Sequence, residues 1–268
     1  MQRVLIAAGA LLLAAVAAPA AAQEEVPFVT TPDRVTLAML ELAGVGANDH
    51  VIDLGSGDGR IVITAARRFG ASGLGVEIVP ELVVRSRAHA RAAGVEDRVA
   101  FREQDLFSNA LAGDLARASV ITMYLLPEVN LQLRPRLLAL APGTRIVSHD
   151  WDMGEWAPDR SLTLDVPEKT IGRDKVSRVH LWVVPARVHG AWCAGRERIE
   201  LTQRFQAFSA SWQPAGEVPP LVFDGRIDGR TLRTTVGRPV VMRAGEGTLE
   251  VLDPAPPNTA ARRFTRCG

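Results

Sequence analysis

Short apolar runs alternate with longer amphipathic stretches as far as residue 184. Strands are predicted at 51–54, 74–78, 99–105, 120–127 and 145–148, and helices at 60–69, 80–94 and 128–140. A leading helix is predicted to begin with Thr31 as its N-cap and Pro32 in its first turn. Strands that alternate with helices in this way predict a doubly wound, mostly parallel sheet of the α/β class, similar to the Rossmann arrangement.

The end of this sheet departs from the alternation. Residues 151–160 are too few for a full crossover helix, since a parallel connection needs a dozen or more. We therefore expect the runs at 162–166 and 176–184 to close the sheet as an antiparallel pair.

The pattern changes from Trp192 onward, where helical periodicity fades and short alternating runs appear between prolines. Such runs occur at 199–208, 221–223, 226–230, 232–236 and 248–252. Asp228-Gly229 is a hairpin signal. The chain is therefore predicted to consist of residues 1–22 as a signal peptide, 23–188 as the α/β domain and 189–268 as a small antiparallel β domain.

A glycine-rich turn joins the first predicted strand to its helix. It reads Asp-Leu-Gly-Ser-Gly-Asp-Gly from Asp53 to Gly59, with glycine at 55, 57 and 59 and Ser56 between the first two. Glycines at such a turn let a ligand approach the backbone, and the helix that follows presents free N–H groups. The alternative is an ordinary tight turn without a ligand.

The second predicted strand ends in an acid, Glu77, which lies 18 residues beyond Gly59. This is close to the spacing at which a carboxylate binds ribose hydroxyls in nucleotide-binding folds. The pattern is Gly-x-Gly-x-Gly, which favours a nucleoside ligand over a pyrophosphate. Three other strand ends carry polar groups, namely Asp105, Tyr124 and Asp150, and parallel strands bring their carboxyl ends to one edge.

Together, Asp-Leu-Gly-Ser-Gly-Asp-Gly-Arg and Gly-Val-Glu resemble the first motif and following acid of class I S-adenosyl-L-methionine (SAM) methyltransferases. The resemblance covers residues 26–188 and is greatest to the mitochondrial lysine methyltransferases that modify the ATP synthase c-subunit and the adenine nucleotide translocase, and to their exported bacterial relatives. It implies that SAM binds with its methionine portion at Gly55–Gly57 and Asp53. Glu77 would bind its ribose, while Asp105 and Leu106 would contact its adenine.

The acceptor side of the site is less defined. Tyr124-Leu125-Leu126-Pro127 stands where many N-methyltransferases carry Asn-Pro-Pro-Tyr, so Tyr124 either lines the acceptor channel or is a core aromatic residue. His149 and Asp150 are candidate proton acceptors. Because adjacent strand residues point to opposite faces, both are not expected to reach the same spot. No metal site is predicted.

Residues 1–22 have the pattern of an export signal, with Arg3, an apolar run and Ala20-Ala21-Ala22. We therefore expect a periplasmic or secreted protein without stable membrane insertion after cleavage; an uncleaved anchor is the alternative. Cys193 and Cys267, the two cysteines, favour a disulfide in such a chain. The balance of 31 basic and 30 acidic residues predicts no nucleic-acid partner.

These features predict a SAM-dependent methyltransferase that modifies a lysine or another amine of a protein. One alternative is a small-molecule methyltransferase that uses the same pocket. Another is a non-catalytic SAM- or nucleoside-binding protein of the envelope, since SAM is made in the cytosol and the signal directs the chain out of it.

Overall fold

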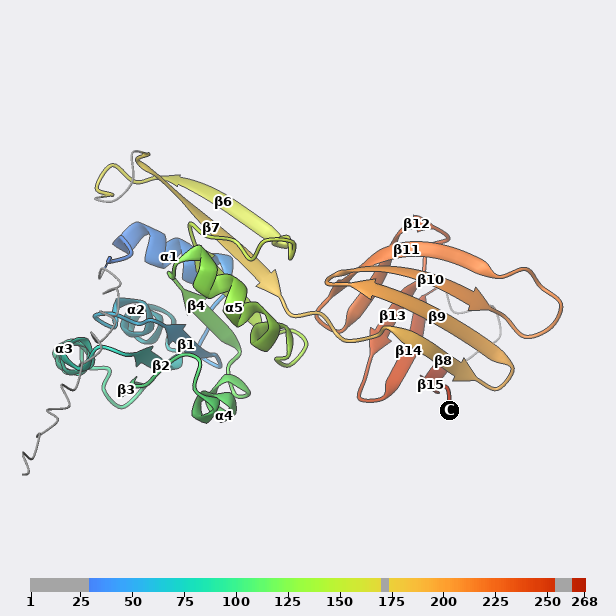
Figure 1. Ribbon diagram of the computed structural model, residues 1–268, viewed down its shortest axis with the longest axis horizontal. Helices are drawn as coiled ribbons and strands as arrows, with labels where there is room; N and C mark the ends of the chain where they lie inside the picture. Colours follow the sequence, from blue (N-terminus) through green and yellow to red (C-terminus); the bar gives the residue numbers. More distant parts are fainter. Residues whose placement is uncertain (1–28, 170–173, 254–261) are drawn as a thin grey trace, which may run out of the picture.

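The computed structural model describes residues 29–169, 174–253 and 262–268 (Figure 1). The predicted signal peptide at 1–22 lies outside these residues. Among the described helices, none combines the length and the apolar character that a membrane crossing requires.

A seven-stranded sheet forms the first part of the chain. Its strands are β1 (His50–Leu54), β2 (Ser72–Glu77), β3 (Val99–Glu103), β4 (Val120–Met123), β5 (Arg145–His149), β6 (Arg160–Asp165) and β7 (Val176–Val183). Their order is β3-β2-β1-β4-β5-β7-β6. The first five strands pair in parallel, whereas β7 is antiparallel to both β5 and β6. The predicted fold class and its antiparallel closing pair are confirmed.

Helices cover both faces of this sheet. They are α1 (Asp33–Leu42), α2 (Arg60–Phe69), α3 (Pro80–Ala92), the 3-10 helix η1 (Asn109–Leu111), α4 (Ala112–Leu115) and α5 (Pro127–Leu138). Alternation along β1 divides the core between them. Val51 packs in a cluster with side chains of α1 and α2, while Ile52 and Leu54 pack with side chains of α4 and α5.

The start of α1 differs from the prediction. Its N-cap is Pro32, which makes no side-chain capping hydrogen bond. The Thr31 hydroxyl instead lies 3.4 Å from Nδ1 of His149 and is buried. The predicted N-cap at Thr31 is therefore wrong, because a long-range partner takes its hydroxyl.

The connection between β5 and β6 contains no crossover helix, as expected. An isolated bridge joins Met153 to Trp156 there. Trp156 is fully buried, and its carbonyl accepts a hydrogen bond from the Trp182 indole N–H at 2.7 Å. The short connection thus closes one end of the core with aromatic side chains.

The C-terminal part is an eight-stranded closed barrel in the order β10-β11-β12-β13-β14-β15-β8-β9. Its strands are β8 (Gly190–Ala194), β9 (Glu197–Arg204), β10 (Ala207–Gln213), β11 (Leu221–Asp228), β12 (Thr231–Gly237), β13 (Val241–Ala244), β14 (Thr248–Asp253) and β15 (Arg262–Arg266). The Asp228-Gly229 turn joins β11 to β12, as predicted. The alternating run at 199–208 covers most of β9, the turn after it and the start of β10.

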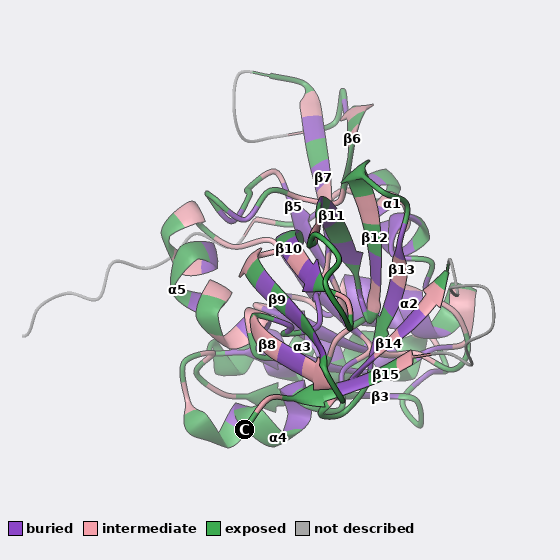
Figure 2. Ribbon diagram, turned by 90° about the vertical axis from the view of Figure 1, so that its right-hand side faces the viewer, coloured by how far each residue is buried: buried purple, intermediate pink, exposed green. Residues whose placement is uncertain are grey.

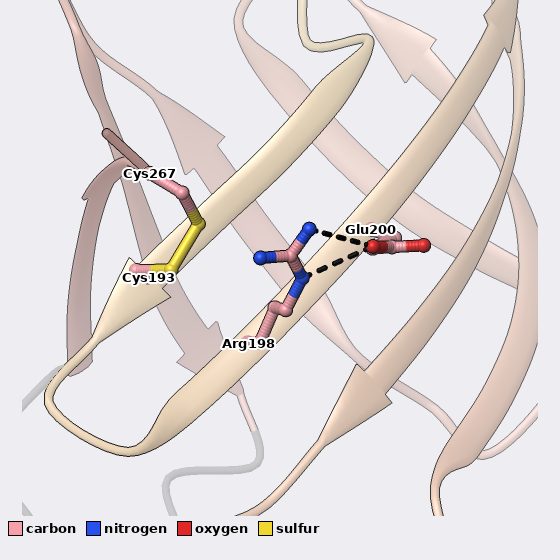
Figure 3. The surroundings of a disulfide bond; sticks show 4 residues. All are labelled: Cys193, Arg198, Glu200 and Cys267. Carbon is pink, nitrogen blue, oxygen red and sulfur yellow. Dashed lines mark hydrogen bonds and ion pairs between the residues drawn. A yellow bond between two sulfur atoms is a disulfide. The ribbon is translucent and has the colours of Figure 1, made fainter.

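Side chains fill the barrel. Trp212 and Phe264 meet edge to face at 5.9 Å, and Phe208 and Phe223 do so at 6.3 Å. A disulfide joins Cys193 to Cys267 beside the seam where β8 pairs with β15 (Figure 3). The chain-entropy model assigns such a closed loop roughly 4 kcal/mol of stabilisation.

The sheet and the barrel contact each other through the turn before β10. The Phe205 ring stacks on Trp156 with 6.3 Å between centroids, and the Gln206 amide donates to the carbonyl of Ala157 at 2.9 Å. Arg226 forms an ion pair with Asp159 at 2.9 Å. Figure 2 views the molecule from the barrel end and shows buried and exposed residues alternating along the barrel strands.

Candidate active site

The glycine-rich turn lies between β1 and α2, at the carboxyl edge of the sheet. Gly55, Gly57 and Gly59 all have positive φ, at 74°, 53° and 81°. A Cβ added at Gly55 would lie 2.7 Å from Cδ2 of Leu125, and one at Gly59 would lie 2.7 Å from the Phe101 ring. Glycine is therefore required here both for the backbone conformation and for the space.

Glu77 is buried at the end of β2 and contacts this turn directly. Its Oε2 accepts the backbone N–H of Gly57 at 2.8 Å. Its Oε1 accepts the N–H groups of Ile78 and Val79 at 2.8 and 3.1 Å. The carboxylate is thus fixed against the turn, as its sequence spacing suggested.

Asp53 lies deeper than its predicted ligand role suggested. Its side chain is buried within the sheet, where the Thr122 hydroxyl donates to Oδ1 at 2.7 Å. Burial raises the pKa of Asp53 to about 7, the Thr122 hydrogen bond lowers it, and the nearby carboxylates of Glu77 and Asp58 raise it further. Asp53 is therefore a carboxyl that titrates near neutral pH directly beneath the glycine turn.

Large apolar side chains are exposed just beyond three strands of the sheet, two on one side of β1 and one on the other. Ile78, Phe107 and Leu126 follow β2, β3 and β4 and are 58%, 44% and 44% exposed. Asp105 is exposed beside them and uses Oδ1 to accept the Phe107 N–H at 2.8 Å. Leu106 is half-buried against the cluster around α4 and α5. This edge offers an apolar surface with a carboxylate, which suits an adenine ring.

Two buried polar atoms at the same edge have no partner among the described residues. They are the Ser56 hydroxyl in the glycine turn and the Gln104 side-chain amide nitrogen at the end of β3. A buried polar group without a partner is costly, so a ligand that bonds to it is stabilising. Together with the Glu77 carboxylate and the narrow glycine turn, these atoms fit an adenosyl ligand.

Tyr124 and His149 lie together on the other half of the edge. Tyr124 follows β4 and His149 ends β5, and their ring centroids are 3.9 Å apart with 33° between the planes. Burial raises the pKa of the Tyr124 hydroxyl, and the neighbouring Asp150 carboxylate raises it further. Tyr124 is therefore a neutral phenol that faces a carboxylate.

Asp150 reaches the same spot as His149, contrary to expectation. The regular strand ends at His149, and Asp150 adopts a positive φ of 62°, which turns its side chain back. Its Oδ2 lies 3.5 Å from Nε2 of His149. The prediction of opposite faces was wrong because it assumed that extended geometry continues through residue 150.

Comparisons with known proteins agree with this geometry. A family model for the ANTKMT methyltransferase domain matches residues 53–160. A protein-lysine N-methyltransferase from Saccharolobus islandicus strain REY15A is 41% identical over 142 residues, which are 52% of this chain and 86% of that protein. The chain belongs to this methyltransferase family.

Two further relatives extend the comparison. The adenine nucleotide translocase lysine N-methyltransferase of Mus musculus is 36% identical over 50% of this chain, which spans 57% of the mouse protein. A solved structure, that of an RNA methyltransferase from Salinibacter ruber in complex with S-adenosyl-L-homocysteine (SAH), matches with a TM-score of 0.53 and 50% sequence identity. It covers 60% of this chain and 96% of that one. The chain is thus a SAM-dependent methyltransferase with a Rossmann-like fold.

His149 of this methyltransferase is a neutral, fixed imidazole. Burial lowers its pKa to about 4, Asp150 opposes that shift, and Lys169 adds to it. Its Nε2 lies 2.9 Å from the Ser177 hydroxyl, and Thr31 lies near the other nitrogen. His149 is therefore held between two hydroxyl groups and carries no charge at neutral pH.

Sequence reasoning missed Lys169, which is part of this cluster. Its Nζ donates to Asp150 Oδ2 at 2.8 Å and to the carbonyl of Val176 at 2.6 Å. A cavity of about 310 Å³ is lined by Val29, Thr30, Pro32, Asp33, Arg60, Tyr124, His149, Glu168 and Lys169. No sequence motif brings a residue from the β6–β7 connection to the end of β5, so only the fold places it there.

In the part of the chain that the structure describes, no cluster of side chains could bind a metal ion. No group of three or more histidine, cysteine, aspartate or glutamate side chains is close enough there to hold an ion. His149 and Asp150 instead use their polar atoms on Ser177, Arg178 and Lys169.

Proposed function

We propose that this enzyme methylates the ε-amino group of a lysine in a protein. The observation that carries this assignment is the cluster at the end of β5. There, the Asp150 carboxylate and the Val176 carbonyl already bind a lysine ammonium in a cavity beside Tyr124. The same groups are suited to an incoming lysine. The relatives named as protein-lysine and translocase-lysine methyltransferases support the same acceptor.

We assign the cofactor half of the site as follows. The backbone of Gly55–Gly57, with Ser56 between the glycines, and the turn closed by Gly59 would hold the methionine portion above Asp53. Glu77 would accept the ribose hydroxyls, because its carboxylate lies against the Gly57 N–H. Asp105 and Leu106 would contact the adenine, and the Gln104 amide would give it a further donor.

SAM supplies a methyl group that its positive sulfur has already activated. The protein must therefore align the acceptor nitrogen, exclude water and remove one proton. Asp150 is the group that touches the bound ammonium, so we assign it as the proton acceptor. Tyr124 would border the acceptor channel, and His149 would hold Asp150 and Tyr124 in place.

A second acceptor class is favoured by one specific relative. The Salinibacter ruber protein that is 50% identical is named as an RNA methyltransferase. An RNA acceptor would need a basic surface, and Arg60, Arg67 and Arg68 line a groove of about 450 Å³ beside α2. This groove is the basis for including RNA in the test. A small-molecule amine is a third acceptor that the same cavity could bind.

We further propose that the enzyme works in the periplasm or outside the cell. The signal-like pattern of residues 1–22 supports this location. The Cys193–Cys267 disulfide supports it as well, because disulfides persist in oxidising compartments. In this arrangement residues 23–188 form the catalytic domain and 189–268 a β-rich domain that packs against it.

One assay separates these acceptors. The purified full chain is incubated with methyl-labelled SAM and, in parallel, with an envelope protein extract, total RNA and a lysine-rich peptide. We expect label in protein, recovered as N-methyllysine after hydrolysis. Label confined to RNA, or to small molecules of the extract, would contradict the proposal. Calorimetric binding of SAH to the same preparation serves as the control for an intact cofactor site.

A further inference from the structure

Lys169 is one of two lysines in a chain with 31 basic residues. It lies in the connection between β6 and β7, and its side chain is only 13% exposed. Its backbone N–H bonds to the carbonyl of Val166 at 3.0 Å, which turns the segment back toward the sheet. The connection between β6 and β7 thus places a mostly buried lysine side chain in the site.

The Lys169 ammonium lies beside the residues assigned to the acceptor half of the site. It lines the same cavity as Tyr124, His149 and Arg60, and Arg60 is the first residue of α2, directly after the glycine turn. The Lys169 Nζ is 2.8 Å from Oδ2 of Asp150, the residue that follows the cavity-lining His149. The cavity therefore extends from the lysine amine to Arg60, the residue that follows the glycine turn.

The second lysine provides a contrast within the same connection. Lys175 is exposed, and its Nζ donates to the backbone carbonyl of Lys169 at 2.5 Å. It does not line the cavity. Two lysines close in sequence thus differ in whether they face the site.

We propose that Lys169 is itself a methyl acceptor, modified within its own chain. This inference rests on the proposed lysine methyltransferase function, and it adds a modification site to that function. The alternative is that Lys169 is a structural ion pair that fastens the β6–β7 connection to the end of β5.

The chemistry balances with the groups present. The Lys169 ammonium gives one proton to the Asp150 carboxylate, which leaves a lone pair on Nζ. That lone pair forms the new N–C bond while the S–CH₃ bond of SAM breaks, and its electron pair stays on sulfur as neutral SAH. The proton then leaves Asp150 for water, and the methylated Nζ is left as a secondary ammonium.

The first experiment maps methylation on the full chain. The protein is incubated with SAM that carries a deuterated methyl group, and peptides that contain each lysine are analysed by mass spectrometry. We expect label on Lys169 and none on Lys175, at a rate that does not change when the protein is diluted. Lys175→Arg should retain the label and Lys169→Arg should lose it.

A second measurement needs no turnover. With ¹³C-labelled lysine, the ε-carbon NMR spectrum contains one signal for each of the two lysines. Addition of SAH should shift the Lys169 signal and leave the Lys175 signal in place, because only Lys169 lines the cavity. Assignment follows from the signal that Lys175→Arg removes.

The outcomes separate this inference from the function on which it rests. If the enzyme binds SAH and methylates a lysine-rich peptide while Lys169 stays unlabelled, self-methylation is wrong and the proposed function stands. If SAH binds and no lysine is labelled anywhere, both fail. Labelling that slows on dilution would place the reaction between molecules and overturn the intramolecular step. A Lys169 ε-carbon signal that does not shift when SAH binds would also contradict self-methylation at Lys169.

Discussion

The two halves of the carboxyl edge are built in different ways. The cofactor half uses a continuous stretch, 53–59, and one acid, Glu77, that contacts it through backbone N–H groups. The acceptor half uses Tyr124, Asp150 and Lys169, which are brought together from three separate connections. A nucleoside site can therefore be specified by a short local motif, whereas the acceptor site depends on long-range packing. Substitutions in the cofactor half should therefore change SAH affinity, whereas substitutions in the acceptor half should change kcat.

The largest effect is expected at Asp53, on the cofactor side. Its carboxyl has a pKa of about 7 in the folded chain, against about 3.9 in an unfolded one. Below pH 4 it is protonated in both states. As pH rises from 4 to 7 the unfolded state ionises and the folded one does not, so stability falls by up to about 4 kcal/mol. Above pH 7 the loss is complete.

Urea unfolding across this pH interval tests that effect. Asp53→Asn, whose amide oxygen can still accept from Thr122, should remove this part of the pH dependence and be the more stable protein above pH 7. If Asp53 pairs with the cofactor's amino group, SAH affinity should rise over the same interval in the unmutated enzyme. Parallel stability curves for the two proteins would show that Asp53 is not the titrating group.

The next effect is expected at Glu77. Glu77→Ala removes the acceptor of three backbone N–H groups and of the ribose hydroxyls. We expect SAH affinity to fall by about 3 kcal/mol, roughly 150-fold. Calorimetry measures the change, and Glu81→Ala, an exposed acid in the first turn of α3, is the matched control. Unchanged affinity in Glu77→Ala would remove Glu77 from the cofactor site.

Asp150→Asn should act on turnover and leave cofactor binding in place. Asparagine tolerates the positive φ at this position, so the turn is preserved while the charge is lost. We expect kcat to fall roughly 30-fold, which corresponds to an activation barrier higher by about 2 kcal/mol. SAH affinity should stay unchanged within about twofold. An equal loss in both quantities would mean that the two halves are not separable.

The smallest effect is expected at Tyr124. Its hydroxyl faces Asp150, and Tyr124→Phe removes that hydroxyl while the ring against His149 remains. The loss of one such hydrogen bond predicts a fall in kcat of about fivefold, near 1 kcal/mol. Unchanged turnover in a steady-state assay would restrict Tyr124 to a packing role.

The sequence was sufficient where local patterns decide the structure. The helix predicted at 60–69 is α2, Arg60–Phe69, because a glycine turn precedes it and Gly70 ends it. The closing antiparallel pair followed from the short connection at 151–160. Glu77 was placed correctly against the glycine turn, because its spacing from that turn is a property of one β-α-β unit.

The sequence was insufficient where distant segments meet. Closure of the barrel depends on the pairing of β15 with β8, at opposite ends of the C-terminal part, and no local pattern encodes it. The chain turns after β9 at Phe205, which has a positive φ although it is not a glycine. The sequence pattern therefore did not indicate the turn inside the run at 199–208. The positive φ of Asp150 and the arrival of Lys169 were missed for the same reason, since both depend on contacts across the sheet.

The central claim is that one edge of the sheet binds an adenosyl group at Glu77 and presents an amine at Asp150. A crystal structure with SAH bound tests this claim most directly. The account predicts ribose hydroxyls on the Glu77 carboxylate and the sulfur facing the cavity that is lined by Tyr124, His149 and Lys169. A nucleoside bound elsewhere, or a sulfur directed away from that cavity, would contradict it.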